Sequence, residues 1–286
     1  MLKLSPYHLR RPLIVVLFLF AFAVKAFEQP QSDTLIRKSG NKVEIKVLFG
    51  NGQIKEIIHL KNNLKHGPQL QYSSAGVLLS KSNYRIGLLC GKFIEYNNKG
   101  EVVAYKSYLC NTEKNSSVLH GKYVEYEGKI LITKGHYKKG QKDGKWLQYH
   151  RNGIIKSEQH FIDGNSIGEQ KFYNNKGDLN YKSNMIEVEQ NGKKTAVKHG
   201  TFMSYHQSGN ISEEGNFSYD KKSGLWKEYN PNGALQREIF YKNGKVHGTN
   251  NQYSNNGKPS MKSEFYEEIE IEGKLLKNVF NGTKEN

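Results

Sequence analysis

Aromatic side chains recur at one position of a repeated sequence pattern, and they are the residues best suited to bind a partner. This aromatic column consists of Phe93, Tyr123, Trp146, Phe202 and Trp226, with lysines nearby. Exposed rings beside Lys suit sugar rings, acyl chains or the side chains of another protein. Aromatic residues in strands also pack against one another, so the same column can instead form the core. The sequence leaves both interpretations open.

Ten histidines could supply metal ligands, but their positions follow the repeat. Four of them directly precede a glycine that opens a copy of the pattern: His66, His120, His199 and His247. A zinc site needs three or four ligands that converge on one point, whereas these histidines lie one or more copies apart. We therefore predict residues that flank turns, and no metal ligands and no cofactor.

Glutamates also recur with the repeat, at positions such as Glu158, Glu214 and Glu238. A glycosidase needs two carboxylates at a defined separation across a cleft, and repetition favours a solvated ladder paired with neighbouring lysines. The sequence contains no Gly-x-Ser-x-Gly, phosphate-binding loop or His-Glu-x-x-His motif. We predict no catalytic residues and a protein that is not an enzyme.

The two cysteines, Cys90 and Cys110, flank one copy of the pattern. If Gly91 to Tyr108 forms a hairpin that turns at Asn97–Gly100, the two thiols meet across its open end. We predict a disulfide between them, as is common in exported chains. The chain has no Cys-x-x-Cys motif, so the sequence does not indicate a catalytic thiol.

The elements that position these residues come from a tandem repeat. In eight copies a Gly is followed five positions later by a Tyr, and in seven of them another Gly stands four positions after the Tyr. The opening glycines are Gly67, Gly91, Gly121, Gly144, Gly168, Gly200, Gly224 and Gly248. Most starts lie 24 residues apart, and the other intervals are 23, 30 and 32 residues. Such a period indicates one supersecondary unit stacked many times.

Each copy has the sequence of a β-hairpin. In the copy that opens at Gly144, a short extended run ends in the turn His150–Gly153, and a second run covers Ile154–Phe161 before Asp163-Gly164 turns the chain back. Asn tolerates and Gly prefers the positive φ that such turns require. Aromatic and β-branched residues flank the turns, and no window has an apolar period of 3.6 residues. The chain is therefore predicted to be all-β.

The predicted architecture is an elongated tandem array of antiparallel β-hairpins in a single twisted or curved sheet. The array covers residues 45–280 with eight or nine copies, the first of them a degenerate copy around Phe49–Gly52 that serves as a cap. Residues 27–44 form an N-terminal lead-in, and residues 281–286 form a C-terminal tail.

Three segments carry a resemblance to a known repeat: Gly144–Gly153, Gly224–Gly233 and Tyr241–Gly248. They resemble MORN repeats, most closely the bacterial MORN variant found in proteins labelled YwqK-family antitoxins. The resemblance extends over about residues 45 to 280. It implies single-layer arrays of β-hairpins that bind proteins or, in some eukaryotic members, contact phospholipid.

The first 26 residues have the pattern of a signal peptide. Lys3, Arg10 and Arg11 form a positive region, Leu13–Val24 is an apolar run, and Ala26 ends a short cleavage motif. Twelve apolar residues are fewer than the roughly 20 that span a bilayer as a helix. We predict an exported chain, periplasmic or extracellular, that is cleaved after Ala26. An uncleaved anchor is the alternative.

The chain is strongly basic, which favours acidic partners. Its formal charge is +16, and it falls to +12 without residues 1–26, which hold four Lys and Arg residues and no acidic residue. Such a surface attracts an acidic protein, glycan or lipid surface, or serves solubility alone. Nucleic acid has the same charge but is not expected to be a partner of an exported chain.

Two classes of function fit these observations. The first is an exported, non-enzymatic binding or scaffold protein for a protein or an acidic component of the cell envelope, with possible peripheral contact to the membrane surface. An antitoxin-like or immunity-like binding protein is a variant of this class. The second is an envelope-active enzyme on polysaccharide, whose carboxylate pair the linear sequence hides.

Overall fold

The structure is a computed structural model that describes residues 33–255, 257–265, 270–271, 274–275 and 281–283. Every regular element in these residues is a β-strand. The strands of the first half are β1 Thr34–Ser39, β2 Lys42–Leu48, β3 Ile54–Lys61, β4 Leu64–Tyr72, β5 Leu78–Arg85, β6 Leu88–Leu89, β7 Gly91–Tyr96, β8 Val102–Asn111, β9 Ser116–Leu119, β10 Gly121–Glu127, β11 Ile130–Lys138 and β12 Gln141–Tyr149. Those of the second half are β13 Ile155–Ile162, β14 Asn165–Ser166, β15 Gly168–Tyr173, β16 Leu179–Gln190, β17 Lys193–Tyr205, β18 Ile211–Ser218, β19 Lys221–Tyr229, β20 Leu235–Lys242, β21 Lys245–Tyr253, β22 Pro259–Phe265, β23 Glu270–Ile271, β24 Lys274–Leu275 and β25 Asn281–Thr283.

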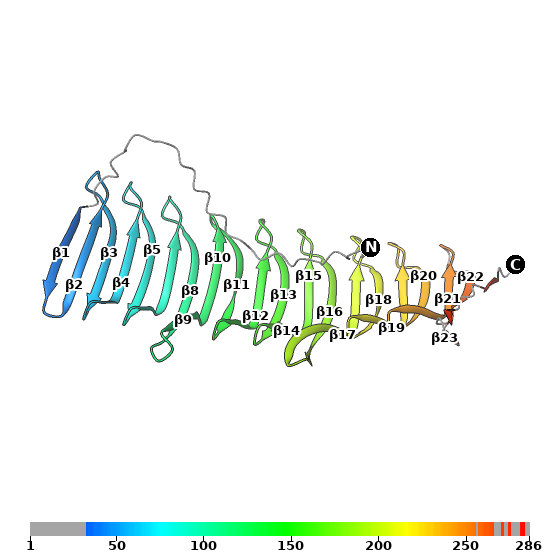
Figure 1. The fold of residues 1–286 in the computed structure, drawn as a ribbon. Helices are drawn as coiled ribbons and strands as arrows, with labels where there is room; N and C mark the ends of the chain where they lie inside the picture. Colours follow the sequence, from blue (N-terminus) through cyan, green and yellow to red (C-terminus); the bar gives the residue numbers. More distant parts are fainter. Residues whose placement is uncertain (1–32, 256, 266–269, 272–273, 276–280, 284–286) are drawn as a thin grey trace, which may run out of the picture.

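The strands form one antiparallel sheet in which neighbours in sequence are neighbours in space. The described residues contain a 23-stranded sheet, and β23 pairs separately with β24. At three places in the sheet an irregularity divides one strand into two. β6 and β7 both pair with β5, β9 and β10 both pair with β8, and β14 and β15 both pair with β13. Figure 1 shows the hairpins standing side by side in a single curved row from β1 to β22. The all-β hairpin array predicted from the repeat is confirmed.

Four-residue turns closed by glycine join the two strands of every copy except the one that opens at Gly121, where only Gly128 and Lys129 separate β10 from β11. In the turn His150–Gly153, the Gly153 N–H donates to the carbonyl of His150 at 2.9 Å, and the His150 N–H donates to Ile154 at 2.8 Å. Gly153 has φ +83°, a conformation without steric cost when no Cβ is present. The same two hydrogen bonds recur at residues 49–53, 73–77, 97–101, 174–178, 206–210, 230–234 and 254–258. The degenerate copy at Phe49–Gly52 therefore forms the same turn as the others.

Shifts in the pairing register bend the hairpins near their opening glycines. The pairing register shifts between Lys134 and His136, between Glu214 and Asn216, and at the corresponding places in other copies. An extra residue in one strand bends that strand and increases its twist. In Figure 1 the ends of the hairpins opposite the four-residue turns curl away from the plane of the upper strands. Trp146 and Trp226 lie at these irregularities, both on one face of the sheet.

The core of the protein lies along that one face. We call it the ring face, the face that carries the aromatic column. Every buried side chain of the described residues except Val124 belongs to it, including Trp146, Phe161, Trp226 and Ile239. The remaining buried residues are small or uncharged: Ala104, Gln69, Ser80, Ser82, Thr133, Ser157, Gln170, Ser183 and Ser263. Large rings on one strand lie over small residues on the next, which gives a single sheet a narrow core.

The sheet extends beyond both ends of the predicted array. At the N-terminal side, β1 and β2 pair from Thr34–Val47 to Ser39–Lys42, within the residues expected as a lead-in. At the C-terminal side, Asn281–Thr283 pairs with β22. The predicted signal segment, residues 1–26, lies outside the described residues. Within the described part, no helix has the length and apolar character needed to span a bilayer.

Candidate binding face

Trp146 is held flat against the sheet by one hydrogen bond and by the absence of a side chain opposite. Its indole Nε1–H donates to the carbonyl of His136 at 3.1 Å, and its side chain is only 3% exposed. Gly135 lies beneath the ring, and a Cβ at this glycine would come within 2.2 Å of the indole. The bulge at Gly135 thus creates the seat in which Trp146 lies.

Trp226 repeats this arrangement in a later copy. Its Nε1–H donates to the carbonyl of Asn216 at 3.0 Å, and it is 1% exposed. A Cβ at Gly215 would come within 2.3 Å of its ring. In both copies the glycine stands 11 residues before the tryptophan. This Gly–Trp pairing was not predicted, although the constant spacing is visible in the sequence.

The other members of the aromatic column, Phe93, Tyr123 and Phe202, are half-buried. Tyr123 lies 5.7 Å from Trp146 between ring centroids, and Phe202 lies 5.7 Å from Trp226. With the rings across from them they form a first ring cluster (Tyr123, Tyr137, Trp146, Phe161) and a second ring cluster (Phe202, Phe217, Trp226, Tyr241). Phe93 packs instead on Tyr108 at 6.1 Å.

Burial limits how the predicted column can bind. The two tryptophans form part of the core, so a ligand on this face meets mainly the three half-buried rings and the groups above them. A binding role for the column stays a prediction. Gln170 takes the column position between the two ring clusters.

Lysines lie over these rings and form the outer surface of the ring face. Lys142 Nζ is 4.4 Å from the Trp146 centroid, and Lys222 Nζ is 3.9 Å from that of Trp226. We call the lysines of this face the lysine row: Lys65, Lys106, Lys142, Lys198 and Lys222. Four of them stand two residues before an opening glycine, a regularity that is visible in the sequence but was not predicted to have a role.

The members of the lysine row differ in their acidic partners. Lys106 pairs with Glu95 at 2.6 Å, and Lys222 pairs with Glu213. Lys142 and Lys198 make no ion pair within the described part of the chain. Burial lowers the pKa of Lys142 below its ordinary value, because a partly desolvated ammonium group is less favourable than a neutral amine.

The opposite face carries the glutamate ladder predicted from the sequence. Tyr229 Oη donates to Glu214 at 2.6 Å, and Tyr253 Oη donates to Glu238 at 2.6 Å. Burial and this carboxylate raise the pKa of Tyr229 to about 12. Glu158 accepts from Lys145 at 2.6 Å, and this hydrogen bond is the main cause of its lowered pKa. Each of these glutamates is thus engaged by a tyrosine or lysine on a solvated surface.

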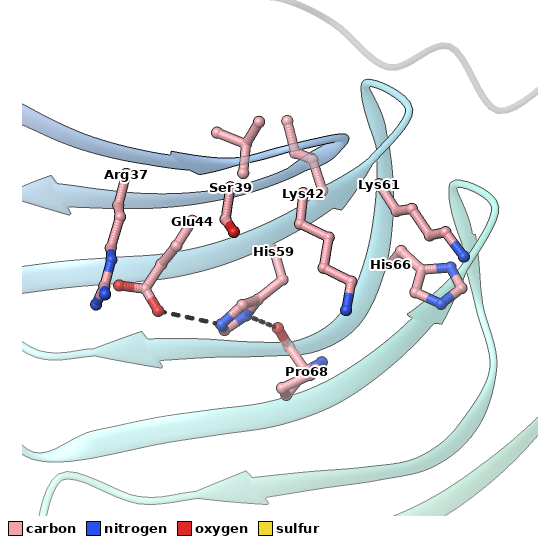
Figure 2. Close-up of a pocket in the computed structure, with 10 residues that line it drawn as sticks. Arg37, Ser39, Lys42, Glu44, His59, Lys61, His66 and Pro68 are labelled. Carbon is pink, nitrogen blue, oxygen red and sulfur yellow. Dashed lines mark hydrogen bonds and ion pairs between the residues drawn. The ribbon is translucent and has the colours of Figure 1, made fainter.

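A second charged site lies at the N-terminal end of the array. A hollow of about 390 Å³ is surrounded by Arg37, Lys42, Glu44, His59, Lys61 and His66, among others. Figure 2 shows His59 at its centre, donating through Nδ1 to the carbonyl of Pro68 at 2.7 Å and contacting Glu44 through Nε2 at 3.3 Å. Basic groups outnumber the single carboxylate here, so this end of the sheet also favours anions.

The two cysteines lie opposite each other at the open end of one hairpin. Cys90 and Cys110 form the predicted disulfide, with their Cα atoms 5.1 Å apart. The described residues contain no group of three or more His, Cys, Asp or Glu side chains able to hold a metal ion.

Comparison with known proteins supports the repeat assignment. The family described as MORN repeat variant matches residues 142–163, 198–219 and 222–243. These three segments therefore have the sequence of MORN repeats of the variant type, and repeats of this family are generally non-enzymatic binding repeats. None of the curated proteins matches the chain.

Three solved structures show low similarity to the chain. The Tc holotoxin pore of Photorhabdus luminescens is 12% identical, with a TM-score of 0.21, and the match covers 87% of this chain but 15% of that one. A porin-like protein from Bacteroides uniformis is 9% identical, with a TM-score of 0.19 and coverage of 88% and 95%. TcdB2-TccC3 is 12% identical, with a TM-score of 0.16 and coverage of 84% and 15%. These TM-scores are too low to relate the folds.

Proposed function

We propose that this MORN-repeat protein is an exported binding module that holds an extended acidic ligand along its ring face. The observation that carries the proposal is the lysine row, in which ammonium groups are fixed over aromatic rings in several copies of one hairpin. No catalytic group enters the proposal.

The repeat gives this row the form of a linear binding surface. Equivalent residues of successive hairpins lie two strands apart, which is about 10 Å. An acidic polypeptide or polysaccharide can meet several such cations at once, whereas a single small anion meets one. The summed attraction of several sites strengthens binding without any single strong contact.

The lysine row is also prepared for an anion. The rings beneath the lysines limit their movement, so little side-chain entropy is lost on binding. Lys142 and Lys198 have no carboxylate partner among the described residues, and an arriving anion would offset the desolvation that lowers the pKa of Lys142. The mature charge of +12 adds long-range attraction.

The proposed function also includes export of the chain. It is supported by the signal-peptide pattern of residues 1–26 and by the Cys90–Cys110 disulfide, a bond typical of oxidising compartments. Intact-mass measurement of the protein from its native source tests it. A chain that begins after residue 26 and has no alkylatable thiol supports export, and an intact N-terminus with two free thiols contradicts it.

Binding is tested with two variants of equal charge. The first replaces four members of the lysine row by Met, which keeps contact with the rings: Lys65, Lys142, Lys198 and Lys222. The control replaces four lysines of the opposite face by Met: Lys145, Lys171, Lys182 and Lys227.

The probes are polyglutamate, as an acidic polypeptide, and heparin, as an acidic polysaccharide. We expect the ring-face variant to lose roughly tenfold or more in affinity, about 1.4 kcal/mol, and the control to lose much less. Binding should also weaken as salt screens the charges. Equal losses in the two variants, with both folded by circular dichroism, would show that net charge and not the ring face binds the probe.

A further inference from the structure

Two copies of the repeat lack both the aromatic column residue and the lysine two residues before the opening glycine. One opens at Gly248 and has Asn250 and Val246 at these positions; the other opens at Gly168. Between the ring clusters, Gln170 stands at the column position that tryptophan occupies at residue 146. Ser166 stands where the lysine row has Lys142, two residues before the opening glycine. Gln159 stands at the bulge position that Gly135 has beneath its tryptophan. This copy therefore has neither the indole nor the lysine above it.

A hollow of about 490 Å³ opens at this place on the ring face. Its lining residues come from β13 to β17: Gln159, Ser166, Gln170, Phe172, Tyr181, Ser183, Met185, Lys198, Phe202 and Ser204. The volume lies in the range of small-molecule pockets, which are concave and mostly apolar with a few polar groups.

Aromatic side chains form one wall of the hollow. Phe172 and Tyr181 stack with their centroids 4.4 Å apart and their planes 15° from parallel. Tyr181 and Phe202 lie 6.1 Å apart with an interplanar angle of 29°. The aromatic pair of this copy thus lies one pleat closer to the four-residue turn than Trp146 does in its own copy. A flat ring is the group that complements such a wall, by offset stacking or edge contact.

Gln170 supplies the hollow with a hydrogen-bond acceptor that receives no hydrogen bond from the described residues. Its Nε2 donates to the carbonyls of Ile167 and Gly168 at 2.9 and 3.1 Å, which fixes the orientation of the amide. The side chain is 2% exposed, and its Oε1 is buried without a hydrogen-bond partner in the described part of the chain. A buried acceptor left without a donor is unfavourable, so a ligand that brings an N–H or O–H group gains from meeting it.

Lys198 supplies the positive charge at the hollow. It is the only charged residue among those that line the hollow, and its Nζ lies 5.9 Å from the Phe202 centroid and 4.9 Å from that of Phe217. It makes no ion pair within the described residues. A ligand with a carboxylate would supply the missing partner, and such pairs are stronger when partly desolvated.

We propose that this hollow is a binding site for an aromatic carboxylic acid with a hydrogen-bond donor on its ring. The ring packs against Phe172, Tyr181 and Phe202, the donor meets Gln170 Oε1, and the carboxylate pairs with Lys198. The site shares Lys198 with the lysine row but differs from the extended binding described above, because it takes one small ligand in one copy of the repeat. The same chemistry could come from a free aromatic acid or from a tryptophan beside an acidic residue in a peptide.

The test measures affinities by calorimetry with indole-3-acetate, which has an indole N–H and a carboxylate. Two matched compounds each lack one group: 1-methylindole-3-acetate has no donor, and indole-3-acetamide has no charge. We expect each to bind roughly tenfold more weakly than indole-3-acetate. The peptide acetyl-Glu-Trp-amide distinguishes the sources, since tighter binding of the peptide assigns the site to a protein partner and tighter binding of indole-3-acetate to a free acid. No binding of either probe at millimolar concentration would overturn the proposal.

Two variants test the place of binding. Gln170→Leu removes the acceptor, so the methylated and unmethylated acids should bind equally well. Gln159→Gly with Gln170→Trp rebuilds the Gly–Trp pair found at Gly135–Trp146 and Gly215–Trp226, and it should fill the hollow and abolish binding while the sheet stays folded by circular dichroism. Gln69→Leu, at the column position of the first copy, is the control and should leave affinity unchanged. Unchanged binding in both test variants would place the site elsewhere.

These outcomes are independent of the acidic-ligand proposal. Gln170→Leu changes no charge, so polyglutamate and heparin should bind it as they bind the unaltered chain. Loss of indole-3-acetate selectivity in this variant with unchanged heparin affinity supports the hollow alone.

Discussion

The copy that contains Trp226 and the copy that contains Gln170 pair their strands in the same way, but the ring face is filled by a side chain in the first and open in the second. In both, the opening glycine of the first strand pairs with the residue six positions after the start of the second strand, and a register shift follows the column. Trp226 lies over Gly215 and is 1% exposed, whereas Gln170 leaves a hollow of about 490 Å³ beside it. The backbone of the hairpin is therefore the same in both copies, and one or two side chains decide whether the ring face is packed as core or left open as a pocket.

The largest expected difference between the two copies concerns the column residue itself. Trp226→Ala should lower the free energy of unfolding by about 3–5 kcal/mol, because it removes a buried ring and leaves a cavity. Gln170→Ala should cost only about 1 kcal/mol, since it loses two hydrogen bonds and already borders an open hollow. Urea unfolding followed by circular dichroism measures both. Similar costs for the two variants would mean that the Trp226 copy is not better packed.

The next prediction concerns the residue beneath the column. Gly215→Ala should destabilise the protein by about 2–3 kcal/mol, because the added Cβ would come within 2.3 Å of the Trp226 ring. Gln159→Ala, the same position in the open copy, should change stability by about 0.5 kcal/mol or less.

A double-mutant cycle identifies the cause. If the clash with the indole is responsible, Gly215→Ala should cost much less in a Trp226→Ala background. An equal cost in both backgrounds would point to backbone strain at this position instead.

The smallest predicted effect concerns the lysine that covers a ring cluster. Burial lowers the pKa of Lys142, so the folded protein binds fewer protons than the unfolded chain between the folded pKa and the unfolded one. The contribution of Lys142 to stability therefore increases as pH rises through this window. NMR titration of the lysine side chains should show Lys142 deprotonating at a pH below the ordinary value of a lysine side chain. Stability measured against pH in Lys142→Met should lack this increase, and identical profiles for the two proteins would contradict the assignment.

The sequence predicted some sites well because the relevant contacts are local. Cys90 and Cys110 flank one hairpin, so the turn at Asn97–Gly100 suffices to bring them together. The engagement of Glu158 by a lysine likewise follows from strand pairing. Contacts that depend on pairing across a short turn can be counted along the chain, since each step along a strand reverses the side of the sheet.

The lysine row and the hollow were not predicted, for a different reason. Whether Lys142 lies over Trp146 or extends into solvent depends on the bend of the strand at Gly135. The unpaired Oε1 of Gln170 arises from a substitution in one copy, and its consequence depends on rings in two neighbouring hairpins. Such contacts combine several strands, so no single segment of the chain contains them.

By itself, the sequence determined the all-β repeat, the turns, the pairing of the two cysteines and the set of residues that share each face. These follow from periodicity and from the conformations that Gly and Asn adopt in turns. The tertiary structure alone decided which face became the core. A single sheet has two candidate faces with aromatic residues. The glycines at the bulges, Gly135 and Gly215, leave room for the tryptophans on the ring face, so these rings are buried there. The tyrosines of the opposite face bind glutamates in contact with solvent.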